Sequence, residues 1–301
     1  RKVHYGIFWP LGAGSHDRVA TVPDVSPPPI NTTAPVLSTL NGDRMFGDCR
    51  TYRPTTASNR IEVGGDSRLW AADGERPYVL LRPAANLNEI EIRPTAPGLT
   101  LELNGLWLGM QLRGTAAGDT LATLRLTGGW DRVVLQDMTI DPGGTQAALV
   151  GDPPGVIPHL RLIIDGRIEE LVIDRCILGS IHEDAGASGS SMACSAARIT
   201  ILDSILLPHG SDPVLELYSA DLTIDRCTIL GDCRLGRAEI ANSILDGILE
   251  VQDAQGSCLR FSMVRSGERI PSPYECAILP NGMPPGSFES VRFGDAGLCL
   301  L

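Results

Sequence analysis

Four aspartates stand where a carbohydrate-active enzyme would need carboxylates, each beside a recurring turn in the sequence. They are Asp137, Asp174, Asp203 and Asp225, with Asp165 and Asp246 nearby. Two carboxylates at a suitable separation can act as acid and base in glycoside hydrolysis. Carboxylates that hold calcium beside a basic residue suit a lyase instead. Arg175 and Arg226 directly follow two of the aspartates, so both chemistries have candidate groups.

The acid–base pair belongs to a repeated phrase, which favours a structural role. Residues 171–180 read LVIDRCILGS and residues 222–231 read LTIDRCTILG, with looser copies at 199–207 and 238–247. A catalytic site is usually unique, whereas charges that recur with a repeat form ion pairs along a surface. Each exposed pair contributes little to stability. We therefore predict a surface ladder of aspartates and arginines and no catalytic residue. Catalysis by Asp174, Asp203 or Asp225 is the alternative.

Two histidines follow these phrases in predicted loops, His182 before Glu183 and Asp184, and His209 in HGSD at 209–212. If they face the same side one repeat apart, they can bind a metal or a sugar or take part in the alternative catalytic site. Solvated loop residues are the simpler interpretation. The five histidines show no zinc-ligand spacing with the cysteines. The sequence thus predicts no cofactor and leaves calcium open.

The eight cysteines are not those of a small disulfide scaffold, because the chain is long and contains no CxxC pair. Cys176 and Cys227 occupy the same point of the repeated phrase, where a small buried hydrophobe fits. Cys258 and Cys276 flank a predicted loop and can either pair or remain free.

Short β-strands must position all these groups. Apolar and polar residues alternate in runs such as EIEI (89–92), RITI (198–201) and DLTI (221–224), and Gly, Asp, Asn and Pro separate the runs. This pattern is typical of strands joined by turns. No amphipathic segment of helix length is present, so the chain is predicted to be all-β.

The repeat predicts how the strands are arranged. Aligned on the small residue after the polar pair, the phrases place Gly105, Met138, Cys176, Ser204, Cys227 and Ser243 at equivalent positions. A solenoid restates a phrase in this way because each copy forms one corner stacked on the last. We predict a single-stranded parallel β-helix, right-handed as crossover connections usually are. A β-sandwich or jelly roll is the alternative.

The intervals between copies are unequal, at 33, 38, 28, 23 and 16 residues, and loops that leave the stack account for this. The longest loops, 141–159 and 182–196, are where function is expected. Solenoid ends expose sheet edges that must be covered. We therefore predict a covering segment with a Pro/Thr-rich arm at 1–48, the β-helix at 49–262 and a C-terminal cap at 263–301.

The composition narrows the classes of partner. The net charge is −11 and the pI is about 4.9, which disfavours binding to nucleic acid or to an anionic membrane surface. No apolar stretch reaches the length of a membrane span. The chain begins with Arg1, so we interpret it as a processed chain or a piece of a longer one.

Several structural phrases resemble those of a group of bacterial proteins. They are VHYGIFWPLGAGSHDR (3–18), ERPYVLLRP (75–83), LTLELNGLWLGMQLRG (99–114), LQDMTIDPG (135–143) and SILDGILEVQDAQGSCLRFSMVRSGERIPSPYEC (243–276). The chain resembles uncharacterised bacterial β-helix-containing proteins associated with phage-tail-like or contractile-injection particles. The resemblance implies a particle-associated or extracellular location and brings no functional residues with it.

Together these observations predict a non-enzymatic structural or surface-binding module of a phage-tail-like or cell-surface assembly. Its expected partners are a glycan or a protein, other subunits of a larger particle, or the rest of a longer chain. The alternative is a carbohydrate-active β-helix enzyme, a polysaccharide lyase or glycoside hydrolase that uses the surface carboxylates.

Overall fold

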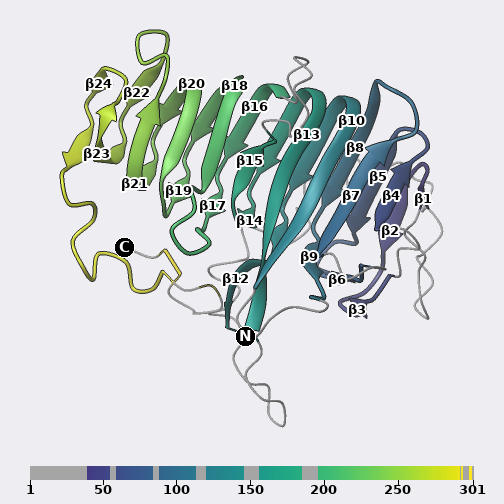
Figure 1. Cartoon of the computed structure of the whole chain (residues 1–301). Coiled ribbons are helices and arrows are strands. Elements are labelled where there is room, and N and C mark those ends of the chain that lie inside the picture. The colour runs from purple at the N-terminus through teal and green to yellow at the C-terminus, as the bar shows by residue number, and fades with distance from the viewer. Residues whose placement is uncertain are drawn as a thin grey trace.

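The computed structural model describes residues 39–54, 59–83, 88–112, 120–145, 156–184 and 196–291, together with Phe293, Leu298 and Cys299. Within these ranges the protein has 25 strands and no helix, so the all-β prediction is confirmed (Figure 1). Most of the expected N-terminal covering segment lies outside the described residues. No helix in the described part of the chain could cross a membrane.

Nearly all strand pairs are parallel, and they form three ladders. The first ladder contains β1 (Thr39–Leu40), β4 (Arg60–Val63), β7 (Glu89–Pro94), β15 (Ile181–Glu183), the first parts of β10 (Leu121–Gln136), β13 (Val156–Asp174), β18 (Leu215–Asp225) and β20 (Cys233–Ala241), and the second parts of β21 (Ile244–Val251) and β23 (Met263–Arg269). We call this ladder 1.

Ladder 2 continues from the same passes of the chain. It contains β2 (Arg44–Phe46), β5 (Ser67–Ala71), β8 (Leu99–Asn104), β16 (Ala196–Leu202), β22 (Cys258–Arg260), β24 (Pro273–Tyr274) and the second parts of β10, β13, β18 and β20.

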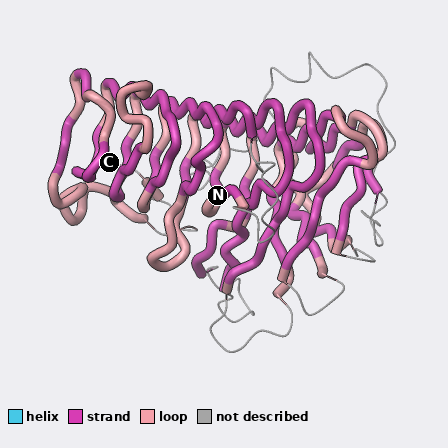
Figure 2. Tube along the Cα trace, turned by 45° about the horizontal axis from the view of Figure 1, so that its top comes forward, coloured by secondary structure: helices cyan, strands magenta, loops and turns pink. Residues whose placement is uncertain are grey.

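Ladder 3 completes each pass. It contains β3 (Thr51–Tyr52), β6 (Tyr78–Leu81), β9 (Trp107–Met110), β11 (Thr139–Ile140), β14 (Ile177–Leu178), β17 (Ile205–Leu206), β19 (Thr228–Ile229), β25 (Ala277–Leu279) and the first parts of β21 and β23. The short β12 (Pro142–Thr145) instead pairs antiparallel with β13. The chain therefore visits ladders 1, 2 and 3 in a fixed order, and Figure 2 shows the successive passes side by side.

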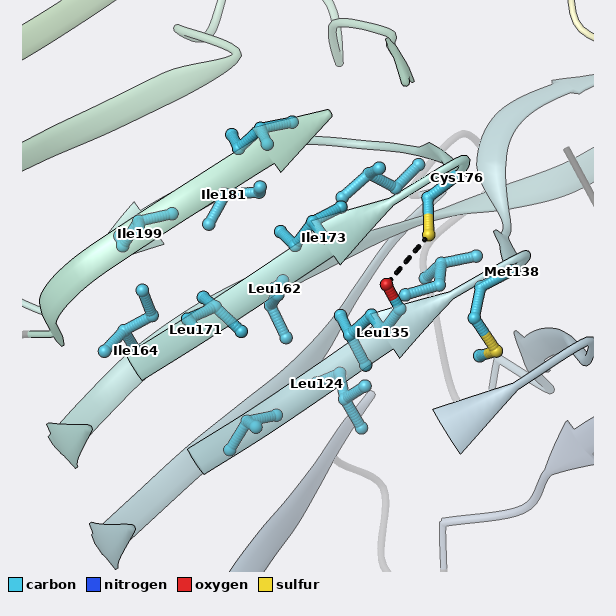
Figure 3. Close-up of a cluster of buried hydrophobic side chains, with 14 of the residues drawn as sticks. Leu124, Leu135, Met138, Leu162, Ile164, Leu171, Ile173, Cys176, Ile181 and Ile199 are labelled. Atoms are coloured by element: carbon cyan, nitrogen blue, oxygen red, sulfur yellow. Dashed lines mark hydrogen bonds between the residues drawn. The ribbon is translucent and has the colours of Figure 1, made fainter. Parts of the chain in front are cut away.

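The interior is one aliphatic core. Strand alternation turns every second residue inward, and the parallel register stacks these residues across passes, as with Val133, Leu171 and Ile199. All three side chains are completely buried. Figure 3 shows Leu171 and Ile199 within this cluster of leucines and isoleucines. Burying such a side chain contributes about 1.5–3 kcal/mol, so the stacked core is the main source of stability.

A column of left-handed residues forms the corner between ladders 2 and 3. Its members are Gly105, Asp137, Arg175, Asp203, Arg226, Asn242, Phe261 and Glu275, with φ between 47° and 71°. Each of the first seven donates its N–H to the carbonyl just before the corner of the next pass, as Asp137 does to Asp174 at 2.9 Å. These stacked hydrogen bonds hold even Arg and Phe in a conformation that L-residues rarely adopt.

The next residue points inward, and this corrects one member of the repeat alignment. Register pairs Asn104 with Gln136, so Gly105 corresponds to the left-handed Asp137 and not to Met138. Leu106 is the true equivalent of Met138. A glycine fits both the left-handed corner position and the inward position that follows it. The sequence alignment therefore placed Gly105 one position away from its structural equivalent.

Small polar groups at this inward position bind the passes together. Ser204 Oγ donates to Leu202 O at 2.6 Å and accepts the N–H of Cys176 at 3.0 Å. Ser243 bonds in the same way to Ala241 and Cys227. The buried thiol of Cys176 contacts Leu135 O at 3.4 Å (Figure 3). The repeated small residue thus supplies a hydrogen bond as well as fitting the corner.

Replacement of Ser204 by Ala is expected to destabilise the protein by about 1–3 kcal/mol. The substitution removes the hydroxyl that accepts the buried Cys176 N–H, and an unsatisfied buried donor costs about that much. Urea denaturation would measure the change in the unfolding free energy. Ser272→Ala is the control, because Ser272 is exposed in the connection that precedes β24. An unchanged midpoint for Ser204→Ala would show that the hydroxyl does not connect the passes.

The ladders extend beyond both expected boundaries, 48 and 262. Within the described residues their first strands are β1 and β2, and β23, β24 and β25 continue them to Leu279. The following segment turns back along the outer side of ladder 3 (Figure 1). There Phe288, Phe293 and Leu298 form a second apolar cluster with outward residues that include Ile177 and Leu207. This segment therefore covers a lateral face of the protein.

Candidate functional site

The aspartates of the repeated phrase are bound by arginines. At the corner of β13, Arg175 donates to both carboxylate oxygens of Asp137, at 2.7 and 3.2 Å, and forms an ion pair with Asp174 at 2.7 Å. Gln136 also donates to Asp174, at 2.8 Å. Burial raises the pKa of Asp174, with the nearby Asp137 and Asp203 carboxylates acting in the same direction and Arg175 opposing them.

The same arrangement recurs at the corner of β18. Arg226 donates to the two oxygens of Asp203 at 2.7 and 2.8 Å and forms an ion pair with Asp225. Asn242 donates to Asp225 at 2.8 Å. Each arginine therefore reaches back to the preceding pass as well as to its own neighbour. The expected pairing of these aspartates with arginines is therefore present at both corners.

The repeated cysteines lie in the core and not in a reactive environment. Cys176 and Cys227 are 1% exposed, and burial raises the pKa of each thiol to about 12. A thiol needs a depressed pKa and access to solvent to act as a nucleophile. The seven cysteines in the described ranges are free, so Cys258 and Cys276 do not pair. Cys194 lies outside these ranges.

The two candidate histidines are both held by protein groups. His182 donates from Nε2 to Pro213 O at 2.7 Å, and its Nδ1 lies 3.8 Å from Glu216. His209 Nε2 lies 3.2 Å from Thr120 Oγ1, and its Nδ1 lies 3.9 Å from Asp212. Their coordinating nitrogens are thus directed at separate partners.

A third histidine, His159, packs against His209 with a ring-centroid separation of 5.0 Å. Its Nδ1 donates to Pro142 O at 2.9 Å, and its Nε2 accepts the N–H of Ser180 at 3.1 Å. The ring is therefore neutral, and burial lowers its pKa to about 4. The Ser180 hydroxyl lies 3.0 Å from Nε2, as in a serine nucleophile. Since the side chains of His159 and Ser180 are both buried, this pair is not accessible to a substrate.

Asp141 is a completely buried carboxylate on the outer side of ladder 3, next to Trp107. Trp107 Nε1 donates to its Oδ1 at 2.7 Å, and Tyr78 Oη lies 3.0 Å from its Oδ2. Burial raises the pKa of Asp141 to about 7, although both hydrogen bonds oppose the shift. Trp107 also packs edge-on against Phe293, at a centroid distance of 6.0 Å. Asp141 thus orients the ring on which the returning C-terminal segment rests.

Asp141→Asn is expected to stabilise the protein at pH 8 and to have little effect at pH 4. A carboxyl with a raised folded-state pKa keeps its proton in the folded state after the unfolded chain has lost it, so stability falls as pH rises from about 4 to 7. Asn mimics the protonated form, since its oxygen can accept from Trp107 and its NH₂ can donate to Tyr78. Urea midpoints at pH 4, 6 and 8 would measure this. Parallel midpoints for both proteins would contradict it.

A surface groove lies farther toward the C-terminal end, on the outer side of ladder 1. It has a volume of about 270 Å³ and is lined by Tyr218, Arg234, Leu235, Glu250, Val251, Gln252 and Arg269. These residues come from β18, β20, β21 and β23 or directly follow one of them. The groove is not predicted by any sequence motif. Its only local signal is the break in alternation at YSAD, residues 218–221.

The structure describes only parts of the two loops that were expected to carry function, 141–159 and 182–196. Residues 146–155 and 185–195, which make up most of the two predicted insertions, lie outside the described residues. Among the residues that are described, no group of three or more His, Cys, Asp or Glu side chains could hold a metal ion. Calcium binding therefore has no candidate ligand set in this part of the chain.

Comparisons with known proteins add no identification. No protein-family model, no curated protein and no solved structure matches the chain.

Proposed function

We propose that the chain is a non-enzymatic binding module built on a right-handed, single-stranded parallel β-helix. The fixed order in which the chain visits three parallel ladders supports the β-helix, since each pass then forms one coil. A β-sandwich or jelly roll would use antiparallel pairs instead. Right-handedness follows the general preference of parallel crossover connections.

The observation that carries the non-enzymatic role is the arginine pairing of the repeated aspartates. A glycosidase needs one carboxyl that gives up a proton and another that faces the sugar or its water. Both carboxylate oxygens of Asp137, and both of Asp203, accept hydrogen bonds from an arginine. Asp174 and Asp225 each contact an arginine and a side-chain amide. The same groups recur from coil to coil, as expected for ion pairs that hold corners together.

A stack of this kind suits recognition because it presents fixed rows of side chains on a rigid core. The ligand we propose is a glycan or a protein surface. By the resemblance noted above, the module belongs to a phage-tail-like or cell-surface assembly, where its partners are other subunits or the rest of a longer chain. A location on a bacterial particle or outside the cell follows from the same resemblance.

A panel of neutral and acidic glycans, scored for both binding and cleavage, tests this role. We expect binding without new reducing ends or unsaturated products. Asp174→Asn and Asp203→Asn should leave binding unchanged, like the control Asp221→Asn at an exposed position. Cleavage that Asp174→Asn or Asp203→Asn abolishes, and that Asp221→Asn retains, would establish the enzyme instead.

A further inference from the structure

The groove on ladder 1 joins an exposed aromatic ring to several planar polar groups. Tyr218 is 39% exposed and borders the groove together with Arg234, Glu250 and Gln252. Sugar rings are recognised by this combination, because their C–H face packs on an aromatic ring while their hydroxyls bond to guanidinium, carboxylate and amide groups. The volume, about 270 Å³, is near the lower limit for small-ligand pockets. The groove therefore fits a single sugar unit.

A β-bulge holds Tyr218 in place. Register between β18 and β20 shifts after Leu217, so that residues 218–220 lie opposite Gly236 alone. Bulges re-aim side chains in this way. The Glu183 carboxylate accepts the N–H of Tyr218 at 2.8 Å and that of Ser219 at 3.0 Å. The backbone that carries the Tyr218 ring is thus held in place, as is required of a ring on which a sugar stacks.

Arg234 is loosely paired compared with other arginines in its row. The row runs through outward positions of ladder 1 and alternates in sign from Glu216 through Arg234 and Glu250 to Arg269. Arg234 lies 3.7 Å from Glu216 and 4.0 Å from Glu250, beyond hydrogen-bond distance. Arg60, farther along the row, lies 2.7 Å from its glutamate. The guanidinium of Arg234 therefore retains donors for a ligand.

The charges beside the groove determine the class of sugar. The two arginines are balanced by Glu216 and Glu250, so the row carries no excess charge at this point. The chain as a whole has a net charge of −11, which repels polyanions. We propose that the groove binds a neutral pyranose unit of a glycan, with Tyr218 stacking on the ring and Arg234, Glu250 and Gln252 bonding to its hydroxyls. This rests on the proposed binding function and assigns its site.

Titration calorimetry against neutral oligosaccharides of glucose, mannose, galactose and N-acetylglucosamine tests the site, with polygalacturonate and alginate as acidic probes. We expect a neutral probe to bind and Tyr218→Ala and Arg234→Ala to weaken it at least 10-fold. Gln252→Ala, at a surface position, should weaken it less. Tyr274→Ala and Arg132→Ala are the controls, since both residues are exposed tyrosine and arginine positions on ladder 2, away from the groove. Unchanged urea midpoints would show that the variants fold.

Each other outcome overturns the site in a distinguishable way. Neutral binding that Tyr218→Ala and Arg234→Ala retain would leave the proposed binding function intact and exclude this groove. Binding of acidic probes alone would exclude the neutral class. Absence of all glycan binding would also overturn the site and restrict the proposed function to a protein partner. Cleavage of a probe would overturn the non-enzymatic function itself.

Discussion

Arg175→Ala is expected to destabilise the protein by about 2–4 kcal/mol, somewhat less than the roughly 3–5 kcal/mol typical of breaking a fully buried ion pair. The Asp137 side chain is only 1% exposed, and Arg175 provides a two-point hydrogen bond to its carboxylate. Removing the guanidinium leaves a buried negative charge without this counterion. Because Arg175 itself is 31% exposed, water partly compensates for the loss.

Arg226→Ala is the matched control, because Arg226 occupies the same corner position in a later pass. Its partner Asp203 is 37% exposed and stays hydrated when the arginine is removed. The midpoint of urea denaturation should fall clearly for Arg175→Ala and barely change for Arg226→Ala. Equal shifts for the two variants would show that burial of Asp137 does not decide the strength of the corner.

Gly236→Ala is expected to destabilise the protein by about 3 kcal/mol and to abolish any binding in the groove. A Cβ at this position would lie 1.9 Å from the carbonyl oxygen of Tyr218. The contact is with backbone, so no side-chain rotation relieves it, and strain of this kind costs about 1–3 kcal/mol or more. The bulge must then move, and Tyr218 moves with it.

Gly47→Ala serves as the comparison for this variant, since a Cβ there meets no atom within 4 Å and the backbone is not left-handed. Urea denaturation and glycan titration should both separate the two variants. A Gly236→Ala protein with normal stability would mean that the bulge is adaptable. Normal stability with normal binding would exclude the bulge as the support of the groove.

Much of the fold could be predicted from the sequence because its signals are local. Alternation in runs such as RITI marks strands that bury one face, and the repeated Asp-Arg-Cys marks a corner that is followed by an inward-facing residue. The corner was placed correctly at Met138, Cys176, Ser204 and later copies, since these residues stack in the structure. It was misplaced at Gly105, where a glycine fits two adjacent positions equally well.

The groove could not be predicted in the same way, because its residues converge only through the register of separate strands. Tyr218 and Arg269 are far apart in the chain, and neither stands in a motif. Asp141 was missed for a different reason. It precedes Pro142 and two glycines, a context that indicates an exposed turn, and its burial follows from the side chains of Tyr78 and Trp107 above it.

The segment that returns along ladder 3 has a consequence for how the protein is made. Strands of each ladder touch only their neighbours, so the passes can form one after another as the ribosome releases them. The apolar outer row that includes Ile177 and Leu207 packs against Phe288, Phe293 and Leu298, which are synthesised after it. Until those residues are synthesised, the row remains exposed apolar surface on the nascent chain. A ribosome-bound intermediate truncated near residue 280 should therefore be the most aggregation-prone form of the protein.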